Sequence, residues 1–443
     1  MGAGHVLHRS TRERPPVARS GEGITLIDAA GRRYLDACGG AAVSCLGHGD
    51  PRVAAAIAEQ AARLEFVHTG FFTTAEAEEL ADLIAAQAPG SLNRVWYTSS
   101  GSEAIEAALK LARQYHLERG NPERSRVIAR RLSYHGNTLG ALSAGGSLWR
   151  REPYAPLLFD ATLIEPCFAY RCAEPGESAE DYGRRAADSL VEAIERLGPD
   201  TVMAFVAETV VGATAGAVPP VPGYLLRIRE ICDRYGVLLI LDEVMCGSGR
   251  TGTFLSCEQD GVVPDIATLG KGLGAGYQPI GAVLCTGEVY DALAQGSGAL
   301  KHGQTYNAHP VGCSAALKVQ QIIRDEGLLG RVQVAGERML TLLRQRFGNH
   351  PNIGDIRGRG LLLALELVAD RQTKAPFDPA LALHVRAKNE AFARGLLIYP
   401  GGGTADGRAG DHILLAPPYN VTDAEIEMIV DLLADTLAVV LPS

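Results

Sequence analysis

The 443-residue sequence lacks the features that mark several broad classes of protein. It has no apolar run near the roughly 18 residues that a membrane-spanning helix needs. Residues 1–16, MGAGHVLHRSTRERPP, have no apolar core, so we do not expect a secretory signal. Positive charge is not in excess, because 42 Lys and Arg stand against 51 Asp and Glu, for a net charge of −9. We therefore expect a protein that binds neither membranes nor nucleic acids.

The nine cysteines include no C-x-x-C pair and no regular framework spacing. This usage predicts reduced thiols and a cytoplasmic protein. Cys232 and Cys285 lie in apolar stretches, where we expect them to be core residues. His302 and His309 are seven residues apart without a third ligand nearby, so no metal site is predicted.

A nucleotide-binding P-loop is also absent. The apolar run VLLILDEV (237–244) places Asp242 and Glu243 at its end, as in the acidic strand of a P-loop ATPase. That interpretation requires a G-x-x-x-x-G-K-[ST] loop, and Lys271 is instead followed by Gly272. Two interpretations remain: a carboxylate that pairs with a protonated ring nitrogen, or a structural ion pair or helix-start carboxylate.

The central part of the chain alternates between strand-like and helix-like segments. Strands are predicted at 94–99, 126–131, 201–208 and 237–244, and amphipathic helices at 101–116 and 223–236. This alternation predicts an α/β fold with a doubly wound, mainly parallel sheet, whose ligands bind at the carboxyl ends of the strands.

The two ends of the chain have a different character. Residues 21–40 are typical of a β-hairpin, and residues 331–443 mix helices with short strands such as GLLLALEL. We predict a large α/β domain at 66–330. A smaller α+β domain would combine the N-terminal segment 1–65 with the C-terminal part 331–443.

Four short stretches carry candidate chemistry, each with an ordinary structural alternative. Ser100, Gly101 and Ser102 precede a predicted helix, where they would hold an anion or simply cap the helix. Tyr134 and His135 follow a strand, and they would stack on a flat group or merely pack. The threonine of HGQTYNAHP (302–310) precedes a helix that Pro310 begins. Lys271 stands in the Gly-rich turn TLGKGLGAGYQP (268–279), where it would cradle a phosphate, form a surface salt bridge or attack a carbonyl carbon as an amine.

These parts make chemical sense together. A phosphate cup, a stacking aromatic, a strand-end carboxylate and a lysine amine are what pyridoxal 5'-phosphate requires of its protein. The lysine would form a Schiff base with the cofactor aldehyde, and the carboxylate would keep the pyridine nitrogen protonated.

The sequence resembles the class III pyridoxal-phosphate-dependent aminotransferases, the family of the omega-transaminases. The resemblance covers nearly the whole chain and rests on motifs in the family's order: SGSEA, YHG, LDEVMCGSGRTG, PDIATLGKGLGAG and HGQTYNAHP. It implies the fold type I of these transferases and a homodimer with the active site at the subunit interface.

The resemblance also implies residue roles. Lys271 would be the Schiff-base lysine and general base, and Asp242 the partner of the pyridine nitrogen. The other implied cofactor-binding residues are Ser100, Gly101, Ser102, Tyr134, His135, Glu208, Val244 and Thr305 of the second subunit. Thr209 follows Glu208 where the family often has proline.

The implied reaction is a transamination in two half-reactions. An amino group would pass from a primary amine, omega-amino acid or amino acid donor to a keto acid such as pyruvate. An aminomutase or a decarboxylase of the same fold is the alternative.

Substrate residues are predicted from a departure in the family pattern. Leu414 stands where many members have a carboxylate-binding arginine, and Arg408 in the upstream loop GGGTADGRAG is the predicted replacement. A solvated loop arginine is the alternative for Arg408. Phe71 and Phe72 are predicted to form apolar walls of the substrate pocket.

Overall fold

The computed structural model describes residues 5–442, and the part of the N-terminal expectation that falls on residues 1–4 lies outside this range. No helix in that described range is long and apolar enough to cross a membrane.

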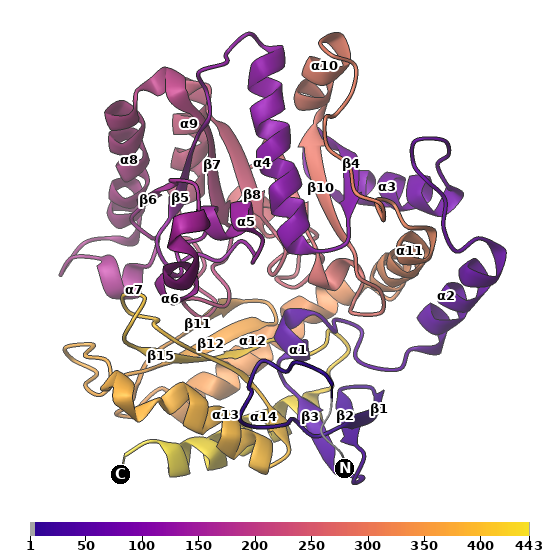
Figure 1. The fold of residues 1–443 in the computed structure, drawn as a ribbon. Helices are drawn as coiled ribbons and strands as arrows, with labels where there is room; N and C mark the ends of the chain where they lie inside the picture. The colour runs from indigo at the N-terminus through magenta and orange to yellow at the C-terminus, as the bar shows by residue number, and fades with distance from the viewer. Residues whose placement is uncertain (1–4, 443) are drawn as a thin grey trace.

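A seven-stranded sheet forms the centre of the larger part of the molecule (Figure 1). In spatial order its strands are β4 (Leu92–Thr98), β10 (Gly281–Thr286), β9 (Ile266–Leu269), β8 (Leu238–Asp242), β7 (Val202–Glu208), β5 (Arg126–Arg130) and β6 (Thr162–Ile164). The pairs from β9 to β6 are parallel, whereas β10 runs antiparallel to both β4 and β9.

Helices cover both faces of this sheet, as a doubly wound fold requires. They are α3 (Ala75–Gln87), α4 (Gly101–Glu118), α5 (Leu139–Ala144), α6 (Leu148–Arg151), α7 (Ala169–Cys172), α8 (Ala179–Leu197), α9 (Tyr224–Tyr235), α10 (Gly287–Gln295) and α11 (Pro310–Asp325). Alternate residues of β8 join different cores: Leu239 and Leu241 pack with α8 and α9, and Leu238 and Ile240 pack with α4. Burial on both faces explains the unbroken apolar run of this strand.

The parallel strands bring distant residues to one edge of the sheet. In the register of β7 and β8, Glu208 lies directly beside Asp242. Tyr134 follows β5 by four residues, and Lys271 follows β9 by two. All four therefore lie at the carboxyl ends of neighbouring strands, where ligands of such sheets bind.

Two four-stranded sheets form the smaller part of the molecule. One contains β11 (Ile353–Arg359), β12 (Leu362–Leu367), β15 (Asp411–Leu415) and β14 (Tyr399–Gly402). The other contains β1 (Ala18–Glu22), β2 (Thr25–Asp28), β3 (Arg33–Asp36) and β13 (Leu396–Leu397). The remaining helices are α1 (Gly39–Ala42), α2 (Pro51–Arg63), α12 (Leu328–Phe347), α13 (Leu383–Ala393) and α14 (Asp423–Val440).

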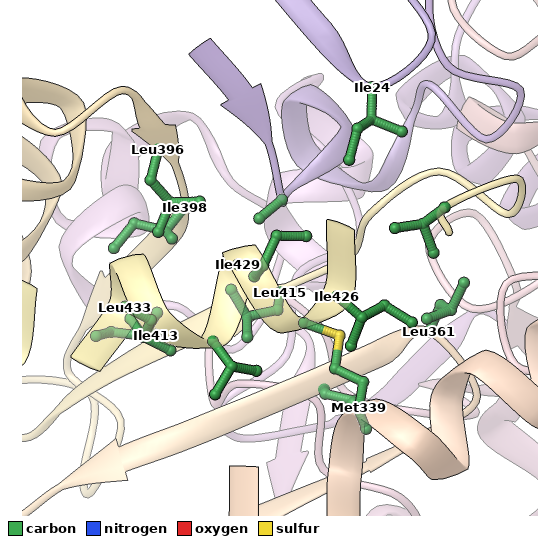
Figure 2. Packing of buried hydrophobic residues seen from close by; sticks show 14 of the residues in the cluster. Ile24, Met339, Leu361, Leu396, Ile398, Ile413, Leu415, Ile426, Ile429 and Leu433 are labelled. Atoms are coloured by element: carbon green, nitrogen blue, oxygen red, sulfur yellow. The ribbon is translucent and has the colours of Figure 1, made fainter. Parts of the chain in front are cut away.

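Both ends of the chain build this smaller part. β13 pairs in parallel with β3 across more than 350 residues of sequence, and both termini lie in this region of Figure 1. Ile24 shares one buried cluster with Met339 and with Ile426 of α14, as Figure 2 shows. The predicted fold class is confirmed. The domain boundaries at residues 65 and 330 stay predictions.

Candidate active site

Asp242 is the buried carboxylate at the centre of the strand edge. Its Oδ2 lies 2.8 Å from Nδ1 of His135, and its Oδ1 accepts a hydrogen bond of 3.0 Å from the backbone N–H of Val244. The hydroxyl of Thr268 lies 3.4 Å from the same Oδ1. These contacts fix the orientation of the carboxylate.

Glu243, the second acidic residue of this strand, has a structural role. Its carboxylate accepts hydrogen bonds from the hydroxyl of Thr209 at 2.5 Å and from the backbone N–H groups of Ser256 at 2.8 Å and Cys257 at 3.0 Å. It therefore holds the loop after β8 in place. The two neighbouring acids thus have different environments, and Thr209 uses its hydroxyl at the position where proline is frequent.

Glu208 connects the segment after β5 to the strand edge. Its Oε1 accepts from the backbone N–H of Tyr134 at 3.0 Å, and its Oε2 accepts from the N–H of Gly212 at 2.9 Å. Burial raises the pKa of this carboxyl group. Through these bonds Glu208 positions Tyr134 and His135 beside Asp242.

The N-terminus of α4 lies against the same edge. Ser100 caps the helix, since its hydroxyl accepts from the N–H of Glu103 at 3.3 Å. Among the described residues, the N–H groups of Gly101 and Ser102 have no protein partner. A Cβ built on Gly101 would lie only 2.7 Å from Cγ1 of Val244. The missing side chain thus allows helix, strand end and turn to meet.

Lys271 begins the turn after β9 in a rare backbone conformation. Its φ of 41° lies in the left-handed region, which costs a non-glycine residue about 1 kcal/mol. Desolvation by burial lowers the pKa of its amine, while the carboxylates of Asp242 and Glu208 act in the opposite direction. Within the described part of the chain, no hydrogen bond or ion pair ends on this amine. A partly buried, unpaired amine with a lowered pKa is suited to act as a base or nucleophile near neutral pH.

A cavity of about 600 Å³ lies beside the segments that follow β5 and β7, with Leu132, Ala213 and Thr214 in its wall, while Lys271 and Asp242 are not among its lining residues. Its walls come from α6, from the loop after β7, from β14 and from the loop between β14 and β15. Arg150 and Arg408 both line it. The side chain of Arg408 is 71% exposed, and its guanidinium is paired with Glu152 at 2.6 Å.

The loop that carries Arg408 is ordered by its own hydrogen bonds. Gly403 and Gly407 bond to one another through the backbone, and Asp406 accepts from the N–H groups of Arg408 at 2.8 Å and Ala409 at 2.7 Å. Leu414 is fully buried in β15, within a small apolar cluster. The cluster explains an aliphatic residue at that position.

Three predicted site residues stand apart from the strand edge in a single chain. Phe71 and Phe72 are 81% and 67% exposed and are not among the residues that line the cavity. Thr305 is also exposed, in the turn before α11. The roles predicted for these three are not tested by one chain.

The sequence interpretation did not single out two residues of the site. Thr268 contacts Asp242 only because β8 and β9 pair in this register, where the two residues are partners. Arg150 lies in LWRRE, and a run of helix-compatible charged residues gives no sign of a cavity. Its place next to Tyr134 follows from the tertiary structure alone.

A doubly wound sheet with a lysine, a carboxylate and a helix N-terminus at its carboxyl edge defines the fold type I transferases that use pyridoxal phosphate. The sequence model of the family Aminotransferase class-III matches residues 7–437. The chain belongs to this family, and it is a pyridoxal-phosphate-dependent aminotransferase.

Individual relatives agree along nearly their whole length. An uncharacterized aminotransferase of Schizosaccharomyces pombe is 44% identical over 98% of this chain and 95% of its own. A thermostable (S)-enantioselective omega-transaminase from Thermomicrobium roseum superimposes with a TM-score of 0.92 at 36% identity, over 99% of this chain and 97% of its own. The PMP-bound form of an aminotransferase from Vibrio fluvialis gives a TM-score of 0.91 at 32% identity, over 98% of this chain and 96% of its own.

The residues present fit the cofactor of the family. Two unpartnered N–H groups at the start of α4, those of Gly101 and Ser102, suit a phosphate. Asp242 suits a protonated ring nitrogen, and the free amine of Lys271 suits an aldehyde carbon.

Proposed function

We propose that this enzyme moves an amino group from a primary amine, an omega-amino acid or an amino acid to a keto acid such as pyruvate. The proposal is carried by one observation: Lys271 and Asp242 lie at the ends of the paired strands β9 and β8, and the segments that follow β5 and β7 at the same sheet edge line a cavity with two arginines in its wall. An amine and a carboxylate at the edge serve the chemistry, and the cationic wall serves an acidic substrate.

In this proposal each side chain has a defined task. The bound cofactor supplies the electron sink for the reaction. Nζ of Lys271 takes the proton from the α-carbon of the donor, which its lowered pKa favours. Asp242 holds positive charge on its partner, and His135 holds Asp242 in orientation. The start of α4 would bind the phosphate, and Val244 and Tyr134 would contact the ring.

The test is a panel of amine donors with pyruvate as the acceptor. We expect alanine to form only when donor and pyruvate are both present. The absorbance of the bound cofactor should change on adding donor alone and return on adding pyruvate. Product formation from one substrate, with no need for a second carbonyl compound, would identify an aminomutase or a decarboxylase instead.

We further propose a cytoplasmic homodimer. The location is supported by nine cysteines that are all free, eight of them buried. Dimerisation is supported by the exposure of Phe71, Phe72 and Thr305, which a second chain would cover.

A further inference from the structure

Arg150 lies against two aromatic rings at the wall of the cavity. Its guanidinium carbon is 4.7 Å from the centre of the Tyr134 ring and 4.3 Å from the Trp149 ring. Such contacts use the faces of the guanidinium plane, through cation–π attraction. The edge, which carries the N–H donors, is left to other partners.

No protein group within the described residues takes up those donors. The Nε of Arg150 is buried and has no hydrogen-bond partner, and the side chain forms no ion pair with any described residue. The terminal nitrogens Nη1 and Nη2 also have no hydrogen-bond partner among the described residues, and unlike Nε they are not buried, so a ligand in the cavity that Arg150 lines can accept from them.

Three other arginines, Arg151, Arg357 and Arg408, are already satisfied by protein partners. Arg151 donates to the carbonyl oxygens of Leu142 at 3.0 Å and Gly145 at 2.7 Å. Arg357 is buried and paired with Glu366 at 2.6 Å, and Arg408 is paired with Glu152. Arg150 is therefore the cation of this group whose donors are free.

We propose that Arg150 binds the carboxylate of the substrate, and that the cavity selects amino acids and keto acids over uncharged amines and aldehydes. The inference rests on the proposed function and names the residue that sets its substrate class. Contacts with the rings of Tyr134 and Trp149 hold the guanidinium, so that its N–H groups can donate two parallel hydrogen bonds to a planar carboxylate. Tyr134 connects this position to the chemistry, since the next residue, His135, contacts Asp242.

The first experiment measures binding without turnover. The holoenzyme is titrated calorimetrically with butanoate and, in parallel, with the uncharged isostere butanamide. We expect butanoate to bind at least tenfold more tightly than butanamide. Arg150→Gln should abolish that preference, and Arg150→Lys, which keeps the charge but not the planar edge, should retain part of it. Equal binding of the two compounds to the wild-type enzyme would overturn the proposal.

The second experiment separates KM from kcat. With one amine donor held constant, Arg150→Gln should raise KM for pyruvate by roughly 30- to 100-fold, because a charged pair in a partly dry site is lost. The KM for butanal, which has no carboxylate, should stay within about threefold of the wild-type value. The kcat at saturating pyruvate should also stay within about threefold of wild type.

Two further variants locate the effect. Arg131→Gln removes an exposed guanidinium that pairs with Glu165 outside the cavity. This variant should leave the KM for pyruvate and the KM for butanal unchanged. Arg408→Ala tests the sequence prediction directly. If Arg408→Ala abolishes the preference for butanoate and Arg150→Gln does not, Arg408 is the carboxylate-binding residue. Equal loss of both acceptors in Arg150→Gln would mean that Arg150 only supports Tyr134.

Failure of this inference is distinct from failure of the proposed function. If the proposed function is wrong, the wild-type enzyme forms no alanine from pyruvate with any donor of the panel. The butanoate titration still reports on Arg150 in that case, because it requires no reaction.

Discussion

The chemistry of single residues in this site depends on burial more than on spacing. Asp242 is buried next to a second carboxylate, Glu208, whose pKa is raised by desolvation. Asp242 has the imidazole of His135 at 2.8 Å and a backbone N–H at 3.0 Å. Bonds to the charged form compensate for burial. We therefore assign Asp242 as the fixed negative charge of the site.

Asp242→Asn tests this assignment. The amide has nearly the same shape but no charge, so the turnover number should fall by roughly 10²–10³-fold while the fold is retained. Steady-state kinetics and circular dichroism measure the two effects. Asp233→Asn on α9, where the carboxylate is 66% exposed, is the matched control and should leave turnover unchanged. Turnover of the Asp242 variant within a fewfold of wild type would contradict the role.

At the scale of elements, the start of α4 is set by close packing. Gly101, Val244 and Gly270 lie in contact, since a Cβ on Gly270 would be 3.2 Å from Val244 and 3.5 Å from Cα of Gly101. The start of α4, the end of β8 and the turn after β9 thus meet at two glycines. This contact aligns the helix N-terminus with Lys271.

Gly101→Ala should disturb that alignment. Its Cβ would lie 2.7 Å from Val244, so one of the two must move, at about 1–3 kcal/mol of unfolding free energy. The affinity for pyridoxal phosphate should fall together with the unfolding free energy. Urea unfolding and equilibrium dialysis of pyridoxal phosphate measure the two quantities.

Gly330→Ala is the control for this change. A Cβ on Gly330 in α12 meets nothing within 4 Å, so the substitution should be neutral or stabilising by up to about 1 kcal/mol. Unchanged cofactor affinity in Gly101→Ala would show that the space beside Val244 does not position the phosphate site.

At the scale of the whole molecule, the proposed homodimer leads to a prediction about Thr305, which is exposed in the single chain. Lys271→Ala and Thr305→Ala homodimers should both be weak or inactive. If Thr305 serves the partner's site, a mixed dimer has one site with both native residues, and activity should rise to about half of wild type. Differently tagged chains, co-expressed and purified in sequence, provide the mixed dimer.

The same experiment can contradict a role of Thr305 in the partner's site. A mixed dimer no more active than its parents would place Thr305 in the site of its own chain. Light scattering checks the assembly first, with an expected mass of about twice the 46.9 kDa chain.

Acid stability is a second property of the whole molecule. His412 is fully buried, and its Nδ1 lies 2.6 Å from the hydroxyl of Thr404. Burial, aided by the charges of Arg357 and His384, lowers the pKa of His412 to about 3. The unfolded chain takes up this proton near pH 6.5 and the folded chain does not, so stability falls as pH drops below 6.5.

His412→Gln should therefore lose less stability on acidification than wild type. Between pH 7 and 4.5 the difference should reach about 2–3 kcal/mol of unfolding free energy. Urea unfolding at the two pH values measures it, with His5→Gln at an exposed position as the control. Parallel losses in wild type and His412→Gln would show that His412 does not limit acid stability.

The sequence alone determined most of the elements and the candidate reacting groups. Alternation of apolar runs with amphipathic helices predicted β4, β5, β7, β8 and α9 within a few residues, because periodicity and burial on two faces are local properties of the chain. Short motifs singled out Lys271 and Asp242, since a Gly-rich turn and a strand-end carboxylate are visible in the letters.

Tertiary structure decided what surrounds those groups. The contact of His135 with Asp242, the pairing of Thr268 with it and the antiparallel direction of β10 all depend on strand register, which no local pattern encodes. Glu243 and Arg408 look as reactive as their neighbours in sequence, but the fold gives each a hydrogen-bonded partner. Arg150 looks like an ordinary surface charge and is left without one. Which charged groups stay free depends on packing between segments far apart in the chain, and this is why only the folded structure could show it.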